Sequence, residues 1–171
     1  RVDEMGRMNG AASWASGAQA CVVKVETDTG VVTVLDYFTL HDCGPQINPQ
    51  IVEGQMHGAV AQGIAGALFE DIRYDEHGQP LSTSFMDYAI PTASEIPWIH
   101  LDHFETPAPE TPLGLKGVGE GGTIGPSAVI AAAVNDALHD LGVEITETPL
   151  TPNRIRGALR LASDPIVGSR K

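Results

Sequence analysis

Two β-rich runs directly before a capped helical segment constrain the fold of this chain most strongly. Residues 18–26 and 31–40 are rich in valine, the second run also contains threonine, tyrosine and phenylalanine, and Asp28-Thr29-Gly30 between them is typical of a hairpin turn. Asn48 and Pro49 then indicate a helix start, because Asn caps helix N-termini and Pro suits the first helical position. A hairpin followed by a helix predicts an α+β fold.

The helix predicted from Pro49 onward has an apolar face and an unusual number of glycines. Its apolar residues recur at helical spacing: Ile51, Val52, Met56, Ala59, Val60, Ile64, Ala67 and Leu68. Its glycines are Gly54, Gly58, Gly63 and Gly66. Each costs roughly 1 kcal/mol relative to Ala in a helix. Two explanations stay open: either another backbone packs closely against this helix, or a bulky ligand does.

The glycine-rich loop at residues 116–125 places a single carboxylate, Glu120, in its middle. A second helix is predicted after the loop, from Pro126 to a stop at Gly142. The backbone N–H groups that begin a helix favour an anion, whereas burial in a closed cleft would favour the neutral acid. Glu120 is therefore a candidate general base.

The same loop also permits two other interpretations. Gly117 to Gly122 spells G-x-G-x-x-G, a fingerprint of dinucleotide sites, but that fingerprint requires a preceding strand and an acidic residue at the end of a second strand. A proline-rich run at 106–112 precedes the loop instead, and Asp136 and Asp140 fall within the predicted helix. The loop is also consistent with a connecting turn that binds no ligand, since most loops serve only to connect.

Further elements are predicted downstream of the first helix. Residues 71–84 resemble a second hairpin, and residues 98–105 resemble a strand that contains His100 and His103. Positions an odd number apart on a strand face opposite sides, so these two histidines are not expected to share a metal. A short strand at 143–145 and a helix after Thr151 complete the pattern. We expect mixed or antiparallel hairpins packed with two main helices.

Composition limits the class of protein. The 171 residues with 42% hydrophobic content suit one domain, residues 1–171, with a disordered tail at 163–171. The net charge of −12 argues against nucleic acid and anionic membrane surfaces as partners, and favours a small-molecule substrate or a protein partner. The sequence has neither an apolar run of about 20 residues nor a signal peptide, so a cytoplasmic location is expected.

Six short motifs occur in a fixed order along the chain. They are Asp42-Cys43-Gly44, Ile47-Asn48-Pro49, Gly54-Gln55, Gln62-Gly63, Asp87-Tyr88-Ala89-Ile90-Pro91-Thr92 and Lys116-Gly117-Val118-Gly119-Glu120. Together they closely resemble the C-terminal part of the molybdenum-binding large subunit of molybdenum hydroxylases. This family includes xanthine dehydrogenase, aldehyde oxidase and aerobic carbon monoxide dehydrogenase. The resemblance extends from about residue 18 to about residue 159.

The resemblance implies specific roles for five residues. Glu120 would be the base beside the metal, taking the remaining proton from metal-activated hydroxide as that oxygen attacks a substrate carbon. Gln55 would approach the molybdenum oxo ligands. Gly117, Val118 and Gly119 would contact the pterin through their backbone. No protein side chain would ligate the metal.

The resemblance also implies partners, because the family's molybdenum subunit is several times longer than this chain. The molybdenum-molybdopterin cofactor would be shared with a missing lobe, and iron–sulfur clusters and FAD would be carried by partner chains or domains. The implied enzyme is a molybdenum-dependent oxidoreductase with a partial active site in this chain. The alternatives are a non-catalytic interaction module of the same fold, and nucleotide binding at Gly117–Gly122.

Overall fold

A three-stranded mixed sheet forms one layer of the protein, for which the computed structural model describes residues 4–6 and 13–163. Strands β1 (Ser16–Glu26) and β2 (Val31–Asp42) are antiparallel, and β3 (Ile99–His103) pairs with β2 in parallel. Gly30 closes the β1–β2 turn with φ of 75°, a left-handed conformation that suits glycine. The predicted first hairpin and the predicted strand after residue 98 are both confirmed.

The two faces of the sheet differ in burial. Tyr37, Thr39 and His41 alternate along β2 on the buried face, while Phe38 is exposed on the other. Parallel pairing places His41 of β2 beside His103 of β3. Polar side chains therefore lie under the layer of helices at the C-terminal end of β2.

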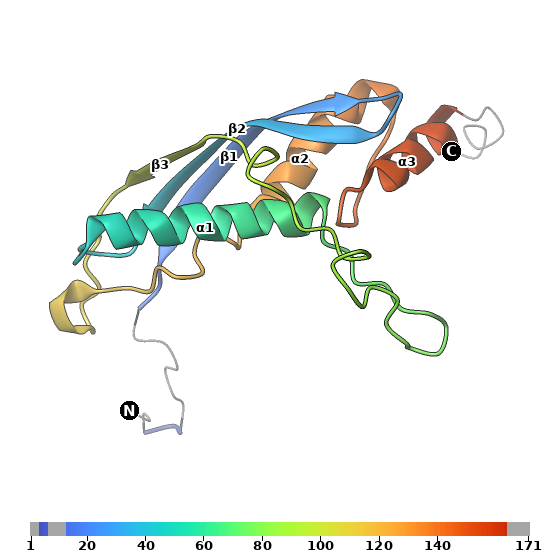
Figure 1. Cartoon of the computed structure of the whole chain (residues 1–171). Helices are drawn as coiled ribbons and strands as arrows, with labels where there is room; N and C mark the ends of the chain where they lie inside the picture. The colour runs from blue at the N-terminus through green and yellow to red at the C-terminus, as the bar shows by residue number, and fades with distance from the viewer. Residues whose placement is uncertain (1–3, 7–12, 164–171) are drawn as a thin grey trace.

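Helices α1 (Pro49–Leu68) and α2 (Pro126–Leu138) cover the buried face of the sheet, as Figure 1 shows. The predicted cap of α1 is confirmed, since Asn48 Oδ1 accepts a hydrogen bond from the N–H of Ile51 at 3.2 Å. One cluster forms the core between the layers: Val34, Tyr37, Val60, Ile64, Ala67, Leu68, Ile99, Ile130, Val134, Leu138, Val143, Ile145, Leu150 and Ile155.

The segment after α2 corrects one prediction. A short 3-10 helix, η2 (His139–Leu141), ends at Gly142 with φ of 67°, which confirms the predicted stop. The strand predicted at 143–145 does not form. Instead the Asn135 side chain accepts from the N–H of Ile145 at 2.8 Å and donates to its carbonyl at 2.9 Å. An amide side chain thus satisfies the backbone groups that a strand partner would have satisfied.

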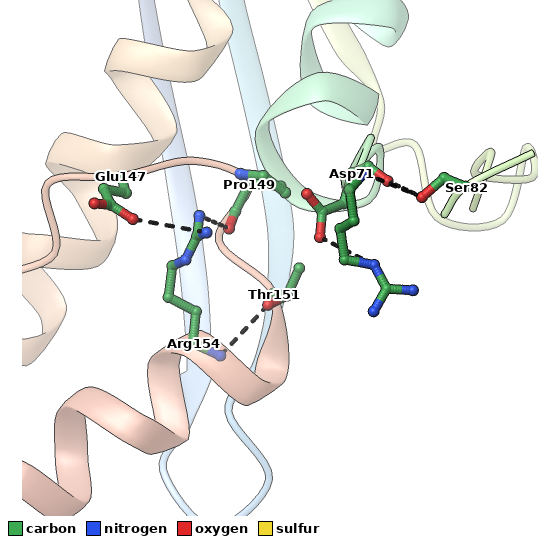
Figure 2. A network of polar contacts seen from close by, with 7 residues as sticks. Asp71, Ser82, Glu147, Pro149, Thr151 and Arg154 are labelled. Atoms are coloured by element: carbon green, nitrogen blue, oxygen red, sulfur yellow. Dashed lines mark hydrogen bonds and ion pairs between the residues drawn. The ribbon is translucent and has the colours of Figure 1, made fainter. Parts of the chain in front are cut away.

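Helix α3 (Pro152–Ser163) begins after Thr151, as predicted, and packs at the far end of the sheet. Figure 2 shows Arg154 bonded to the carbonyl of Pro149 at 2.8 Å and paired with Glu147 at 3.7 Å. The N–H of Leu150 donates to the carbonyl of Ala67 at 2.7 Å and so ties this connection to the end of α1.

Residues 70–98 form an arm that contains no helix or extended strand (Figure 1). The hairpin predicted at 71–84 is therefore wrong, although its turn exists. Asp75 Oδ1 accepts from the N–H groups of His77 and Gln79, and one isolated bridge joins Tyr74 to Pro80. The N–H of Leu81 still donates to the carbonyl of Arg73 at 2.7 Å, but the N–H of Arg73 donates to Ser82 Oγ at 3.2 Å, so the ladder does not extend beyond this bond.

The α+β class and the mixed sheet are confirmed, with α3 as the predicted helix after Thr151 beside the two main helices. Within the ranges described above, no helix is long and apolar enough to cross a membrane. The predicted disordered tail lies outside the described residues, except for Ser163, which is the last residue of α3.

Candidate functional site

A buried ion pair fixes the start of the glycine-rich loop to the end of β2. Lys116 Nζ lies 2.9 Å from Asp42 Oδ2, and these side chains are only 8% and 1% exposed. The N–H of Lys116 also donates to the carbonyl of Cys43 at 2.9 Å. The first residue of the loop is therefore fixed to the C-terminal end of β2 and to the residue that follows it.

The environment of Asp42 favours its charged form. Burial by itself raises the pKa of this carboxyl, but Lys116 and the N–H groups of Gly44 and Thr106 outweigh burial and lower the pKa well below its ordinary value. Asp42 Oδ1 accepts from Gly44 at 2.9 Å and from Thr106 at 3.1 Å. Asp42 thus joins three segments of the chain at one buried carboxylate.

The end of the loop rests directly on α1. A Cβ added to Gly122 would lie 2.9 Å from the carbonyl oxygen of Met56 and 2.8 Å from Cβ of Ala59, so only glycine fits there. Thr123 Oγ1 donates to the carbonyl of Ala59 at 2.9 Å. Gly63, one turn further along α1, lies against the ring of Pro126 at the start of α2.

The middle of the loop is a pair of tight turns. The N–H of Gly121 donates to the carbonyl of Val118 at 3.3 Å, and the N–H of Thr123 donates to that of Glu120 at 3.1 Å. Beneath these turns, a Cβ added to Gly121 would lie 2.5 Å from Cε1 of the buried His41 ring. Gln19 Nε2 donates to the carbonyl of Gly122 at 3.3 Å.

The tip of the loop, residues 117–120, is open. Over the described part of the chain, the N–H groups of Gly117, Val118, Gly119 and Glu120 donate no hydrogen bond to protein, and the Glu120 carboxylate has no hydrogen bond or ion pair. Glu120 and Gly117 are exposed. An open run of backbone donors beside a carboxylate can contact a polar ligand without first breaking internal bonds.

The structure brings the sequence-predicted site residues together on one side of the protein. Gln55 is exposed on α1, and its Oε1 would lie 3.9 Å from a Cβ on Gly119. Gln55 therefore adjoins the loop that carries Glu120. The dinucleotide fingerprint lacks its context, because residues 115–118 have no strand structure.

The glycines of α1 have more than one explanation. Gly63 is required by packing, whereas Gly54, Gly58 and Gly66 have nothing within 4 Å of an added Cβ. The predicted apolar face is buried except for Ile51, which is 59% exposed. The surface of α1 near Gln55 is therefore open, and includes Ile51, Gly54 and Gly58.

Three residues at the base of the loop had no role predicted from the sequence: Asp42, Lys116 and His41. The first two belong to motifs that carried the family resemblance, but only the structure shows that they pair. Alternation along β2 could have placed His41 on the buried face with Tyr37 and Thr39. The predicted separation of His100 and His103 is confirmed, since His100 stacks on exposed Phe38 while His103 is half-buried next to His41.

Comparison with known proteins agrees with this arrangement. Residues 2–97, more than half of the chain, match the molybdopterin cofactor-binding domain family. The nicotine 6-hydroxylase large subunit of Paenarthrobacter nicotinovorans is 43% identical over 83% of this chain and 17% of its own length. The carbon monoxide dehydrogenase large chain of Afipia carboxidovorans is 46% identical over 78% of this chain and 16% of its own length.

Solved structures lead to the same family. The crystal structure of quinoline 2-oxidoreductase from Pseudomonas putida 86 superposes with a TM-score of 0.82 at 45% identity, covering 85% of this chain and 19% of that one. The chain thus spans less than a fifth of the length of these relatives, which are named as a hydroxylase, a dehydrogenase and an oxidoreductase. The resemblance seen in the motifs is confirmed: the chain belongs to the molybdopterin cofactor-binding domain family of the molybdenum hydroxylases.

Proposed function

We propose that this chain is one wall of the active site of a molybdenum hydroxylase that oxidises or hydroxylates a small molecule, with Glu120 as general base. The observation that supports this most is how closely the loop tip approaches α1, since a Cβ added to Gly119 would lie 3.9 Å from Gln55 Oε1. A carboxylate, a side-chain amide and four backbone N–H groups then share one open surface, and within the described residues the carboxylate and the four N–H groups have no protein partner. These are the group types that a charged, oxygen-rich cofactor and a proton transfer require.

The residues of this surface fit a bulky planar cofactor. Added Cβ atoms at Gly54, Gly58 and Gly117 would meet nothing within 4 Å, so the backbone at these positions is free to be approached from outside. Gly117, Val118 and Gly119 would contact the pterin through their N–H groups, and Gln55 would direct its amide at the metal end. When bound, the molybdenum cofactor supplies an oxygen nucleophile at neutral pH and accepts the electrons of the oxidation.

The work of the chain's own residues is then to orient and to move a proton. Two anchors, the Asp42–Lys116 ion pair and the seat of Gly122 on α1, hold the loop while its tip stays open. The Glu120 carboxylate accepts the proton that is released when the substrate carbon is attacked. Fixed geometry contributes here, because a misplaced catalytic group loses rate steeply.

The proposal includes partners, since the chain corresponds to 16–19% of three relatives. We infer that the remaining part of the molybdenum subunit completes the cofactor site around this single domain. Iron–sulfur and flavin chains or domains would carry the electrons away. One of the relatives is named as subunit gamma of a 6-hydroxypseudooxynicotine dehydrogenase complex, which is consistent with a multisubunit assembly.

Replacing Glu120 with Gln in the assembled enzyme tests the role of the base. Nicotine, quinoline and carbon monoxide serve as probes, because they are the compounds named for the relatives, and turnover is followed with a redox dye. We expect kcat to fall by about 10²- to 10⁴-fold, the usual contribution of general base catalysis, with molybdenum content unchanged.

Glu144→Gln is the matched control, because Glu144 is an exposed acid beyond the opposite end of α2. Its turnover should equal that of the wild type. Full turnover in Glu120→Gln would refute the role of Glu120. An assembled protein with neither molybdenum nor pterin would instead support the alternative, a non-catalytic interaction module.

A further inference from the structure

His41 lies directly beneath the turns that carry Glu120. Its side chain is only 3% exposed at the C-terminal end of β2. Gly17 of β1 faces it across the antiparallel register, and an added Cβ there would lie 3.7 Å from His41 Nδ1. An added Cβ on Gly121 would lie 2.5 Å from Cε1 of the same ring. Two glycines, one from the sheet and one from the loop, thus leave a slot that the imidazole fills.

The position of Gly121 determines the position of Glu120. The two residues are consecutive, and the bonds from Gly121 to Val118 and from Thr123 to Glu120 close the turns on either side of the carboxylate. On the other side of Gly121, Gly122 is already in contact with α1. The loop is therefore held between the helix and the His41 ring, and a change in the ring must be absorbed at the tip.

We propose that His41 is a positioning residue, whose ring fixes how closely Gly121 approaches the sheet and thereby sets the direction of the Glu120 carboxylate. This inference rests on the proposed function of Glu120 and extends it to a residue that does not touch substrate or cofactor. His41 acts through packing, as a rigid ring of fixed size.

The charge state of His41 is part of this role. Burial lowers the pKa of the ring below its ordinary value of 6.5, and the neighbouring His103 of β3 and Lys116 of the loop lower it further, while the adjacent Asp42 raises it. His41 Nε2 and both ring nitrogens of His103 are buried and have no hydrogen-bond partner within the described residues. A proton on His41 would therefore introduce a charge beside a second histidine with no acceptor at Nε2.

The direction of the pH effect follows from the lowered pKa. The neutral ring is present above the folded-state pKa, and protonation occurs as the pH falls through a value below 6.5. At low pH the turns should then loosen, and the Glu120 carboxylate should no longer be held in one orientation. We assign this loosening of the turns at low pH to His41 and not to His100, which is exposed on the other face of the sheet.

Two variants in the assembled enzyme separate packing from charge. His41→Ala empties the slot, whereas His41→Phe keeps an aromatic ring that cannot take up a proton. His100→Phe is the matched control, an exposed histidine on the neighbouring strand. The first readout is hydrogen exchange of peptides that cover residues 117–123, corrected for the intrinsic effect of pH. The amides of Gly121 and Thr123 report on the turns because both donate within them.

In His41→Ala we expect exchange at these amides to rise by about tenfold, because opening of the turns would cost roughly 1.4 kcal/mol less than in the wild type. In His100→Phe we expect exchange to be unchanged. In the wild type exchange should increase as the pH falls below 6.5, and in His41→Phe this increase should be absent. Unchanged exchange in His41→Ala, or an acid-dependent increase that persists in His41→Phe, would overturn the proposal.

The second readout is turnover per molybdenum atom with the fastest of the three probes. His41→Ala should lose about 10- to 100-fold in kcat with KM within roughly threefold, because an aimed catalytic group is displaced while substrate contacts remain. A His41→Ala enzyme that loses cofactor but keeps wild-type kcat per molybdenum would show a merely structural role. Full turnover in Glu120→Gln would refute the proposed function separately, whatever the exchange data show for His41.

Discussion

The glycines around the candidate site divide into a closed group and an open group. A Cβ added to Gly63 would lie 2.5 Å from the Pro126 ring, and a Cβ added to Gly122 would lie 2.8 Å from Ala59 Cβ. These two glycines therefore set how closely the loop, α1 and α2 approach one another. At Gly54, Gly58 and Gly117 an added Cβ would meet nothing within 4 Å. The closed group is explained by the fold, whereas the open group points to contacts made from outside.

The packed base of the loop, which includes Gly122 of the closed group, depends most on the Asp42–Lys116 ion pair. The largest effect on stability is therefore expected when this pair is broken. Lys116→Met leaves a buried carboxylate without its cation, which typically costs about 3–5 kcal/mol. Urea unfolding of the purified protein measures this loss. The double variant Asp42→Asn with Lys116→Met removes both charges and should recover much of the stability. A loss below about 1 kcal/mol in the single variant would show that the pair does not hold the loop.

The same ion pair gives the Lys116→Met effect a pH dependence with a definite sign. Because the folded-state pKa of Asp42 is lowered, the stability that its charge contributes is present above its ordinary pKa of 3.8 and is lost as the pH falls through the lower folded value. The difference between wild type and Lys116→Met should therefore narrow below about pH 4.

Gly63→Ala should break the closed packing with an intermediate effect. The new methyl would overlap the Pro126 ring at the crossing of α1 and α2, and overpacking of this kind costs about 1–3 kcal/mol. The thermal unfolding midpoint of the purified protein is the measurement. Gly66→Ala is the control on the same helix, because its added Cβ meets nothing within 4 Å. Equal stability in the two variants would mean that Gly63 is not packed as described.

Much of the fold could be predicted from local sequence signals. The β1–β2 turn, the Asn48 cap and the stop at Gly142 each depend on residues a few positions apart, and all three are confirmed. The strands predicted at 71–84 and 143–145 do not form, because in each segment one side chain takes the backbone hydrogen bonds that a neighbouring strand would have made. Ser82 Oγ accepts the N–H of Arg73 in place of a strand partner, and the Asn135 side chain bonds both backbone groups of Ile145.

The candidate site was predictable only in part, because its supports are long-range. Gln55 and Glu120 were recognised through motifs, and the position of Gln55 next to Gly119, the residue before Glu120, is consistent with that assignment. The ion pair joins Asp42 to a lysine 74 positions later, and His41 meets His103 through parallel strand pairing. No local pattern encodes such contacts, since they depend on which strands become neighbours.

Gly58→Ala tests the open group and should have the smallest effect on the fold. Gly58 lies one helical turn from Gln55 on the exposed surface of α1, and with no atom near an added Cβ the change should stabilise the helix by about 0.5–1 kcal/mol. The methyl would nevertheless protrude into the surface proposed to face the cofactor, so molybdenum and pterin content of the assembled enzyme should fall about tenfold, corresponding to roughly 1.4 kcal/mol. Gly66→Ala should share the stabilisation and keep full cofactor content. If both variants retain the cofactor equally, the open glycines near Gln55 do not form a wall of the site, and only the loop tip would remain as the surface that meets the pterin.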